Sequence, residues 1–276
     1  MRNRLPSFSE LTGRFEKLHD SSPLQSDPSA SEPSAKDPFS AEQSSQLEHA
    51  YLDQQICLFG PERYEPRYDY PLIVWLHSCN SSERELEQLM PELSLQNYVG
   101  CAPRATVACD PEGHRFRWGR SAAATALAEE LVFGSIETAC SQFSVDRKKI
   151  FLAGFGSGAS MAWRVALRYP KRFAGIVSIC GEFPTQQQTL TNLAQVRELP
   201  ALWMVGNESP TCGVTHLCDA LPVMHSASLQ VAIRQYPCGN ELLSNMLLDA
   251  NSWLMERVTN QAANFENSCE ESFSKN

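Results

Sequence analysis

Short, nearly continuous apolar runs alternate with longer helical patterns over most of the chain, and this alternation limits the fold more than any other feature. The run Pro71–His77 (PLIVWLH) is typical of a strand covered on both faces. Strands that alternate with helices predict an α/β fold, with a mostly parallel central sheet and helices on both faces. Further apolar runs lie at 98–102, 149–153, 173–180, 199–205 and 229–236, and helical patterns at 122–143, 157–168, 215–224 and 242–258.

The composition changes near residue 46. Residues 21–45 contain nine serines and four prolines, with only two large apolar side chains. Such a segment cannot bury enough apolar surface to offset its ordering entropy. We therefore expect a disordered segment over 1–45, an α/β domain over 46–260 and a polar tail over 261–276. Within the first segment, 8–18 has the capping and apolar spacing of a short helix, which predicts either a docking segment for a protein partner or a frayed end.

Charge and cysteine usage argue against several classes of protein. The net charge of −9 disfavours nucleic-acid binding, which needs clustered Lys and Arg. No apolar run is long enough for a membrane span, and the N-terminus lacks a secretory pattern, so we expect a cytoplasmic protein. The ten cysteines lack zinc-ligand spacing and are expected to be reduced thiols. Neither a metal nor a cofactor is expected.

A glycine-rich run, Gly154–Gly158 (GFGSG), lies between a predicted strand and a predicted helix. It has the glycine spacing of the GxSxG nucleophile elbow, in which the central residue presents its oxygen from a sharp turn. Here the central residue is Gly156, which has no side chain. Because glycine enters strained backbone regions with little penalty, its presence suits a turn that no longer carries a nucleophile.

Together with this turn, three other segments give the chain a resemblance to the α/β-hydrolase superfamily, and in particular to its phospholipase/carboxylesterase branch, which includes the acyl-protein thioesterases. The resemblance covers about residues 48–258. It implies a Ser, Asp and His triad in that chain order. The triad positions fall on Gly156, Ser209 and Asn240, with Glu208 as an alternative acid, so the resemblance implies a degenerate triad. The segments are 76–79 (LHSC), 150–161, 168–177 (RYPKRFAGIV) and 236–240 (YPCGN).

The positions of the histidines support this interpretation. No histidine follows residue 225, so none can occupy the family's position after the last strand. A general base is typically worth about 10²- to 10⁴-fold in rate, and an asparagine cannot accept a proton in its place. Without nucleophile and base the acyl-enzyme route is closed. We expect a binding or interaction role instead of hydrolysis.

An esterase or thioesterase with a displaced nucleophile is the first alternative. Ser157 would attack the ester, and His77 or His216 would act as the base. A serine at a helix start is more often a cap, and a histidine at a strand end is more often a hydrogen-bonded structural residue.

The resemblance also implies an oxyanion hole made of backbone amides. One amide belongs to Ser157, and the other lies near Ser78 or Cys79. Because a helix N-terminus attracts anions, these donors predict a pocket for a small acyl or carboxylate ligand. The opposing interpretation is an inherited cleft that binds nothing.

A second alternative is dinucleotide binding. Gly154, Gly156 and Ala159 satisfy GxGxxA between a strand and a helix, and Glu182 would serve as the ribose-binding acid. However, that fingerprint normally opens its domain, whereas about 100 folded residues are expected before this one.

Overall fold

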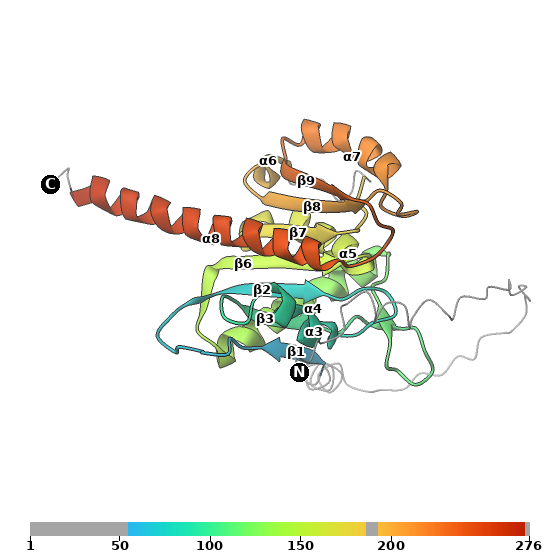
Figure 1. Cartoon of the computed structure of the whole chain (residues 1–276), viewed down its shortest axis with the longest axis horizontal. Helices are drawn as coiled ribbons and strands as arrows, with labels where there is room; N and C mark the ends of the chain where they lie inside the picture. Colours follow the sequence, from blue (N-terminus) through green and yellow to red (C-terminus); the bar gives the residue numbers. More distant parts are fainter. Residues whose placement is uncertain (1–54, 186–192, 274–276) are drawn as a thin grey trace, which may run out of the picture. The chain divides into compact units, whose positions relative to one another are not determined.

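The structure of the protein is a computed structural model (Figure 1). It describes the backbone of residues 55–185 and 193–273, and the side chains of residues 55–185 and 195–259. The expected disordered segment over 1–45, with its short helix at 8–18, lies outside the described residues.

The described chain forms a seven-stranded sheet of order β1-β3-β2-β6-β7-β8-β9. All neighbouring strands are parallel except β1, which pairs antiparallel with β3 at one edge. The predicted α/β fold with a mostly parallel sheet is therefore confirmed. The strands are β1 (Ile56–Phe59), β2 (Tyr70–Leu76), β3 (Val99–Pro103), β6 (Val145–Phe155), β7 (Gly175–Ile179), β8 (Pro200–Gly206) and β9 (Gln230–Tyr236).

Helices cover both faces of the sheet. On β6, the side chain of Phe151 contacts Trp253 of α8, whereas Gly154, three residues further on, approaches α5. Because successive strand residues point to opposite faces, α8 and α5 lie on opposite sides. Helix α3 packs against α8, and α4 packs against α5. The long helices are α3 (Glu85–Leu93), α4 (Ala122–Gln142), α5 (Ser157–Arg168), α7 (Val214–Ser226) and α8 (Ser244–Phe273).

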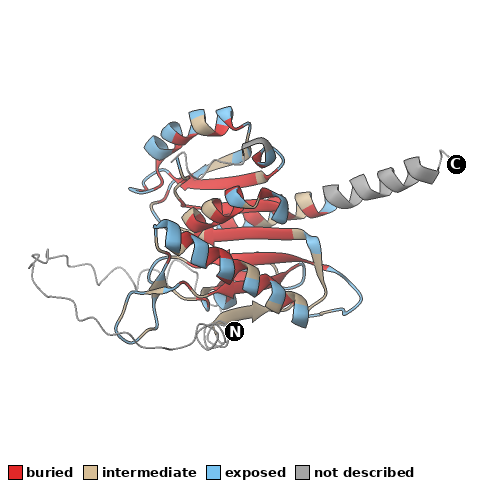
Figure 2. Cartoon of the chain, turned by 180° about the vertical axis from the view of Figure 1, so that it is seen from behind, coloured by how far each residue is buried: buried red, intermediate tan, exposed pale blue. Residues whose placement is uncertain are grey.

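The core lies along the central strands, which are coloured as buried in Figure 2. All seven residues of β2 are buried. This burial on both faces explains why its sequence is continuously apolar instead of alternating. Edge strand β9 shows exposed and partly exposed residues along most of its length.

Several elements differ from the sequence expectation. Helix α8 was expected to end at Val258 but continues to Phe273. Helix α3 and strand β1 were not predicted, because α3 contains Pro91 and β1 has only four residues. A small hairpin of β4 (Val107–Ala108) and β5 (Phe116–Arg117) lies outside the main sheet. No described helix has the length and apolar character needed to cross a membrane.

Candidate functional site

The chain changes direction across the sheet between β2 and β6. From β2 it continues to β3 on one side, and from β6 it continues through β7, β8 and β9 on the other. In open α/β sheets a ligand crevice forms at the carboxyl ends of strands at such a point. The loop after β2, the turn at Gly156 and the loops after β8 and β9 all belong to this carboxyl edge.

The turn at Gly156 requires an unusual backbone conformation but leaves room for a side chain. Its φ is 55° and its ψ is −116°, at the start of α5. A Cβ built at this position would meet no atom within 4 Å. At Gly158, by contrast, a Cβ would lie 2.0 Å from the carbonyl oxygen of Leu76. Gly158 is therefore required by close packing of α5 against β2, and Gly156 is required by its backbone conformation alone.

Ser209 and Asn240, the two other positions that the resemblance assigns to the triad, contact each other directly. The Ser209 hydroxyl donates a hydrogen bond to Oδ1 of Asn240, and the amide of Cys212 donates to Ser209 Oγ at 2.9 Å. Asn240 Nδ2 in turn donates to the Thr211 hydroxyl at 3.0 Å. Glu208, the alternative acid, is exposed to solvent. An uncharged hydrogen-bonded pair thus links the loops after β8 and β9 at the positions that the resemblance assigns to the acid and the histidine.

His77 is buried, and both of its ring nitrogens are engaged by the backbone. The amide of Ala105 donates to Nε2 at 3.0 Å, which leaves Nδ1 to donate to the Ser78 carbonyl at 2.8 Å. Burial is the main cause that lowers the pKa of His77 below its ordinary value. A neutral ring with one donor and one acceptor satisfies both contacts. The histidine therefore fixes the end of β2 and has no free nitrogen for a serine.

Ser157 lies at the start of α5, and its hydroxyl oxygen is buried without a hydrogen-bond partner among the described residues. The neighbouring Ser160 hydroxyl donates to the Gly156 carbonyl and accepts from the Glu182 amide. His216 is exposed on α7. Within residues 55–185 and 195–259, no histidine nitrogen hydrogen-bonds to a serine hydroxyl. The structure does not bring Ser157 together with His77 or His216 as a hydrogen-bonded pair.

Ser78 and Cys79 are the two candidates for the oxyanion-hole amide in the loop after β2, and the Ser78 amide already donates to a carboxylate. The Ser78 amide and hydroxyl both donate to Glu85 Oε2, at 3.1 and 2.7 Å, and Trp75 Nε1 donates to Oε1 at 2.8 Å. Glu85 was not among the predicted site residues, although an acidic residue just after the loop and in a first helical turn is a signal for such an anchor. The Cys79 amide remains as the candidate second donor beside the Ser157 amide in the expected oxyanion hole.

The glycines of the dinucleotide alternative have other roles here. The Gly156 amide donates to the Ile179 carbonyl at 2.9 Å and so is not available to a phosphate. Ala159 packs against Gly181, where an added Cβ would lie 2.4 Å from the alanine Cβ. Glu182 forms an ion pair with Arg120 at 2.6 Å. These contacts are those of helix–sheet packing and a surface ion pair.

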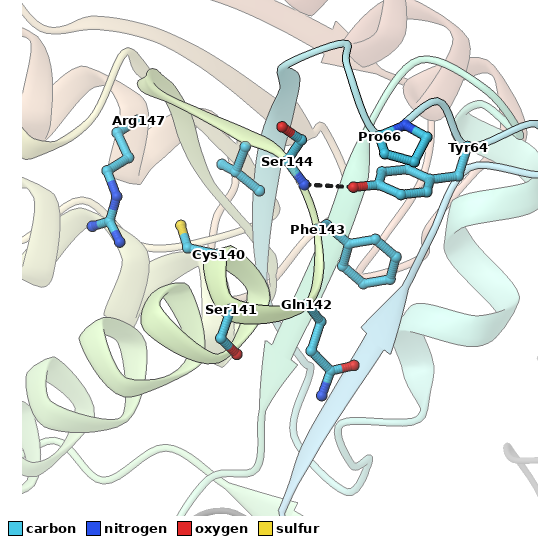
Figure 3. Close-up of a pocket in the computed structure, with 9 residues that line it drawn as sticks. Tyr64, Pro66, Cys140, Ser141, Gln142, Phe143, Ser144 and Arg147 are labelled. Atoms are coloured by element: carbon cyan, nitrogen blue, oxygen red, sulfur yellow. Dashed lines mark hydrogen bonds between the residues drawn. The ribbon is translucent and has the colours of Figure 1, made fainter.

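A cavity of about 460 Å³ lies at the other edge of the sheet, near the amino end of β6. Figure 3 shows the side chains that surround it, including Tyr64, Phe143 and Arg147. Some of its polar groups already have partners: the Ser144 amide donates to the Tyr64 hydroxyl at 2.7 Å, and Arg147 pairs with Glu137, which is outside the lining. The described residues hold no group of three or more His, Cys, Asp or Glu side chains arranged for a metal ion.

Comparison with known proteins supports the family. The sequence model of the family described as Phospholipase/Carboxylesterase matches residues 119–257. Among solved structures, SOBER1 of Arabidopsis thaliana is 20% identical, with a TM-score of 0.57 over 68% of this chain and 99% of that one. The carboxylesterase of Bacillus cereus is 15% identical, with a TM-score of 0.60 over 76% of this chain and 99% of that one. Esterase PE8 is 21% identical, with a TM-score of 0.56 over 72% of this chain and 98% of that one. The resemblance in the sequence is confirmed, and the chain belongs to the phospholipase/carboxylesterase family of α/β-hydrolase fold.

Proposed function

We propose that this chain is a catalytically degenerate member of its family, a pseudo-esterase that binds a ligand without cleaving it. One observation carries the proposal. The triad positions hold Gly156, Ser209 and Asn240, and the last two are hydrogen-bonded to each other where an acid–histidine pair would be expected.

The chemistry of these side chains supports a loss of the hydrolytic route. Gly156 has no nucleophilic atom, and the Asn240 amide has no titratable nitrogen to take a proton from one. Ser209 is neutral, so it would not stabilise a histidinium as the family's carboxylate does. Each element of nucleophilic catalysis is thus replaced by a group without that capacity.

Ligand binding has support in the backbone of the same edge. The Ser157 amide is at the first turn of a twelve-residue helix, where N–H groups lack an intrahelical acceptor. With the Cys79 amide it offers two donors to a carboxylate or an ester carbonyl, aided by the helix dipole. A small acyl or carboxylate compound is the ligand class that this arrangement favours.

The test is a chemical comparison of the natural chain with a rebuilt triad. The natural protein is expected to show no labelling by a fluorophosphonate probe and no turnover of p-nitrophenyl esters. The triple variant Gly156→Ser, Ser209→Asp, Asn240→His is expected to gain labelling at residue 156, because the position has room for a side chain. The single variant Gly156→Ser is the matched control and is expected to label far less. Labelling or turnover by the natural chain refutes the proposal.

Family membership favours one competing function, an esterase or thioesterase that uses Ser157. Its hydroxyl is at the elbow and has no partner among the described residues. This alternative requires turnover by the natural chain that Ser157→Ala abolishes and Ser160→Ala preserves. Dinucleotide binding has less support, and it predicts saturable NAD(H) or NADP(H) binding that Gly156→Val eliminates.

We also propose that the α/β domain spans 46–260 and that the protein is cytoplasmic, with the N-terminal segment available to a protein partner. The nine cysteines of the described residues are free thiols, as expected in a reducing compartment. Limited proteolysis, with sequencing of the protected fragment, tests the domain boundaries. Pull-down with and without residues 1–45 tests the partner segment, and the prediction fails if the captured proteins are the same.

A further inference from the structure

The β4–β5 hairpin is fixed to the loop that follows β2. The Phe116 amide in β5 donates to the carbonyl of Ser81 at 2.7 Å, and the two residues form an isolated β-bridge. At the base of the hairpin turn, the Cys109 amide donates to the Arg115 carbonyl at 2.7 Å. The Asp110 carboxylate accepts from the Arg115 amide at 2.8 Å. The first contact joins two segments that are distant in sequence, and the other two close the hairpin on itself.

The contact brings two thiols together. Cys79 lies in the loop after β2, and Cys109 directly follows β4; both are exposed and free. Besides burial, the Cys109 thiol contributes to raising the pKa of Cys79, as a close neighbour does, while Cys109 Sγ lies 4.0 Å from the carbonyl oxygen of Val107. The third exposed cysteine of the described residues, Cys218, lies on α7, which is part of neither the hairpin nor the loop after β2.

We propose that Cys79 and Cys109 are a redox-modification site, a dithiol that a small-molecule disulfide such as oxidised glutathione converts to an intramolecular disulfide. The bond would tie the β4–β5 hairpin covalently to the loop whose Cys79 amide lies at the carboxyl edge of the sheet. This inference goes beyond the proposed binding function and does not depend on it.

The reaction balances as two successive thiol–disulfide exchanges. One protein thiol loses its proton, and its thiolate attacks a sulfur of oxidised glutathione, which forms a mixed disulfide and releases one glutathione. The second protein thiolate then attacks the protein sulfur of that mixed disulfide and releases the second glutathione. The protein loses two electrons and two protons, and both pass to the glutathione molecules.

Proximity favours a disulfide between Cys79 and Cys109 over thiol–disulfide exchange at other cysteines. Once the mixed disulfide forms, the second thiol is a neighbour and does not have to be found by diffusion. The buried cysteines are protected because exchange requires an accessible thiolate. Burial raises the pKa of the Cys101, Cys180 and Cys212 thiols from about 9.0 to about 12. Burial also raises the pKa of Cys79, so the exchange should accelerate as the pH rises above neutral.

The experiment equilibrates the full chain with oxidised glutathione and reads the products by intact mass and peptide mapping. The wild-type protein should lose two hydrogens, give a peptide crosslinked between Cys79 and Cys109, and retain no glutathione on either residue. Cys79→Ser and Cys109→Ser should each lose the crosslink and retain one glutathione on the remaining partner. Cys218→Ser is the matched control and should form the same crosslink as the wild type.

Three outcomes overturn the proposal. They are glutathione retained on both Cys79 and Cys109 without a crosslink, a crosslink between a different pair of cysteines, and no reaction at either thiol. Peptide mapping reports the covalent bond directly, so these outcomes are readable even if a serine substitution changes the stability of the fold.

Discussion

At the scale of single residues, Gly156 and Gly158 of the elbow are required for different physical reasons. Gly158 leaves no space for a Cβ because the Leu76 carbonyl is 2.0 Å from where that atom would lie. Gly156 has the space, but its positive φ disfavours any residue with a side chain. Substitution at Gly158 makes the new Cβ clash with the backbone of β2. Substitution at Gly156 adds conformational strain only.

This difference predicts unequal losses of stability. Gly156→Ala should lower the free energy of unfolding by about 1 to 3 kcal/mol, the usual range for a strained backbone residue. Gly158→Ala should lower it more, because α5 has to move away from β2 to relieve the contact. Urea unfolding of the two variants measures both values. Equal losses, or a larger loss at Gly156, would show that the central glycine is also required for space.

The candidate site shows what a sequence can and cannot supply at this scale. Gly156, Ser209 and Asn240 could be named from the sequence because each follows a predicted strand at a spacing that the family resemblance defines. Glu85 was missed, because a carboxylate that binds the loop before its own helix leaves no periodic pattern. The neighbouring thiols of Cys79 and Cys109 were missed for a related reason, since only the docked hairpin brings them together.

Glu85 provides a prediction for the loop after β2. Removing its carboxylate leaves Trp75 Nε1 and the amide and hydroxyl of Ser78 without their acceptor. Unpaired groups of this kind cost about 1 to 3 kcal/mol, so Glu85→Ala should destabilise the protein by at least this amount. In this variant the Ser78 amide should exchange with deuterium faster than in the wild-type protein. Glu87→Ala, at an exposed site in the same helical turn, is the control, and a similar effect there would contradict the anchoring role of Glu85.

At the scale of elements, an uncharged network joins the loops that follow β8 and β9. Ser209 lies at its centre: it donates to Asn240 and accepts from the Cys212 amide. The loops also share a backbone hydrogen bond from Glu208 to the Cys238 carbonyl. Neither Ser209 nor Asn240 carries a charge, so these two loops are connected by hydrogen bonds without an ion pair.

The network predicts that Ser209 contributes more to the free energy of unfolding than its neighbour Glu208. Ser209→Ala should lower the free energy of unfolding by about 1 to 3 kcal/mol, because the Cys212 amide loses its buried acceptor. Glu208→Ala, at an exposed site, should change it by less than about 0.5 kcal/mol. Thermal or urea unfolding of both variants decides this point. The reverse order would place Glu208 in the acid position.

Predictability also varied among the elements. The buried central strands and α5 were located within a few residues, since burial on both faces produces an unbroken apolar run. Edge strand β1 is only partly buried along its four residues, and its short sequence has no such signature. The end of α8 was misplaced because the sequence after Val258 is polar and lacks the apolar stripe by which a helix is recognised.

At the scale of the whole molecule, the sequence determined the architecture better than the activity. The alternation of strands and helices identifies the sheet, and its direction change between β2 and β6 identifies the edge where a site belongs. The family's fold depends on many apolar positions, whereas its hydrolytic activity depends on three side chains. Replacing three side chains would leave those apolar positions unchanged, so the fold alone does not report the activity.

The buried thiols predict how stability depends on pH. Cys101, Cys180 and Cys212 ionise near 9.0 when exposed, but burial raises the pKa of each to about 12 in the folded protein. Between these values the folded state holds more protons than the unfolded state, so the free energy of unfolding should fall as pH rises from 9 towards 12. Each thiol contributes at most about 1.4 kcal/mol per pH unit to this slope. Urea unfolding across this interval should give a shallower slope for Cys101→Ala than for the wild type, whereas exposed Cys218→Ala should leave it unchanged. Because any cavity left by the alanine lowers stability by a similar amount at every pH, the slope isolates the thiol, and equal slopes for all three proteins would contradict its contribution.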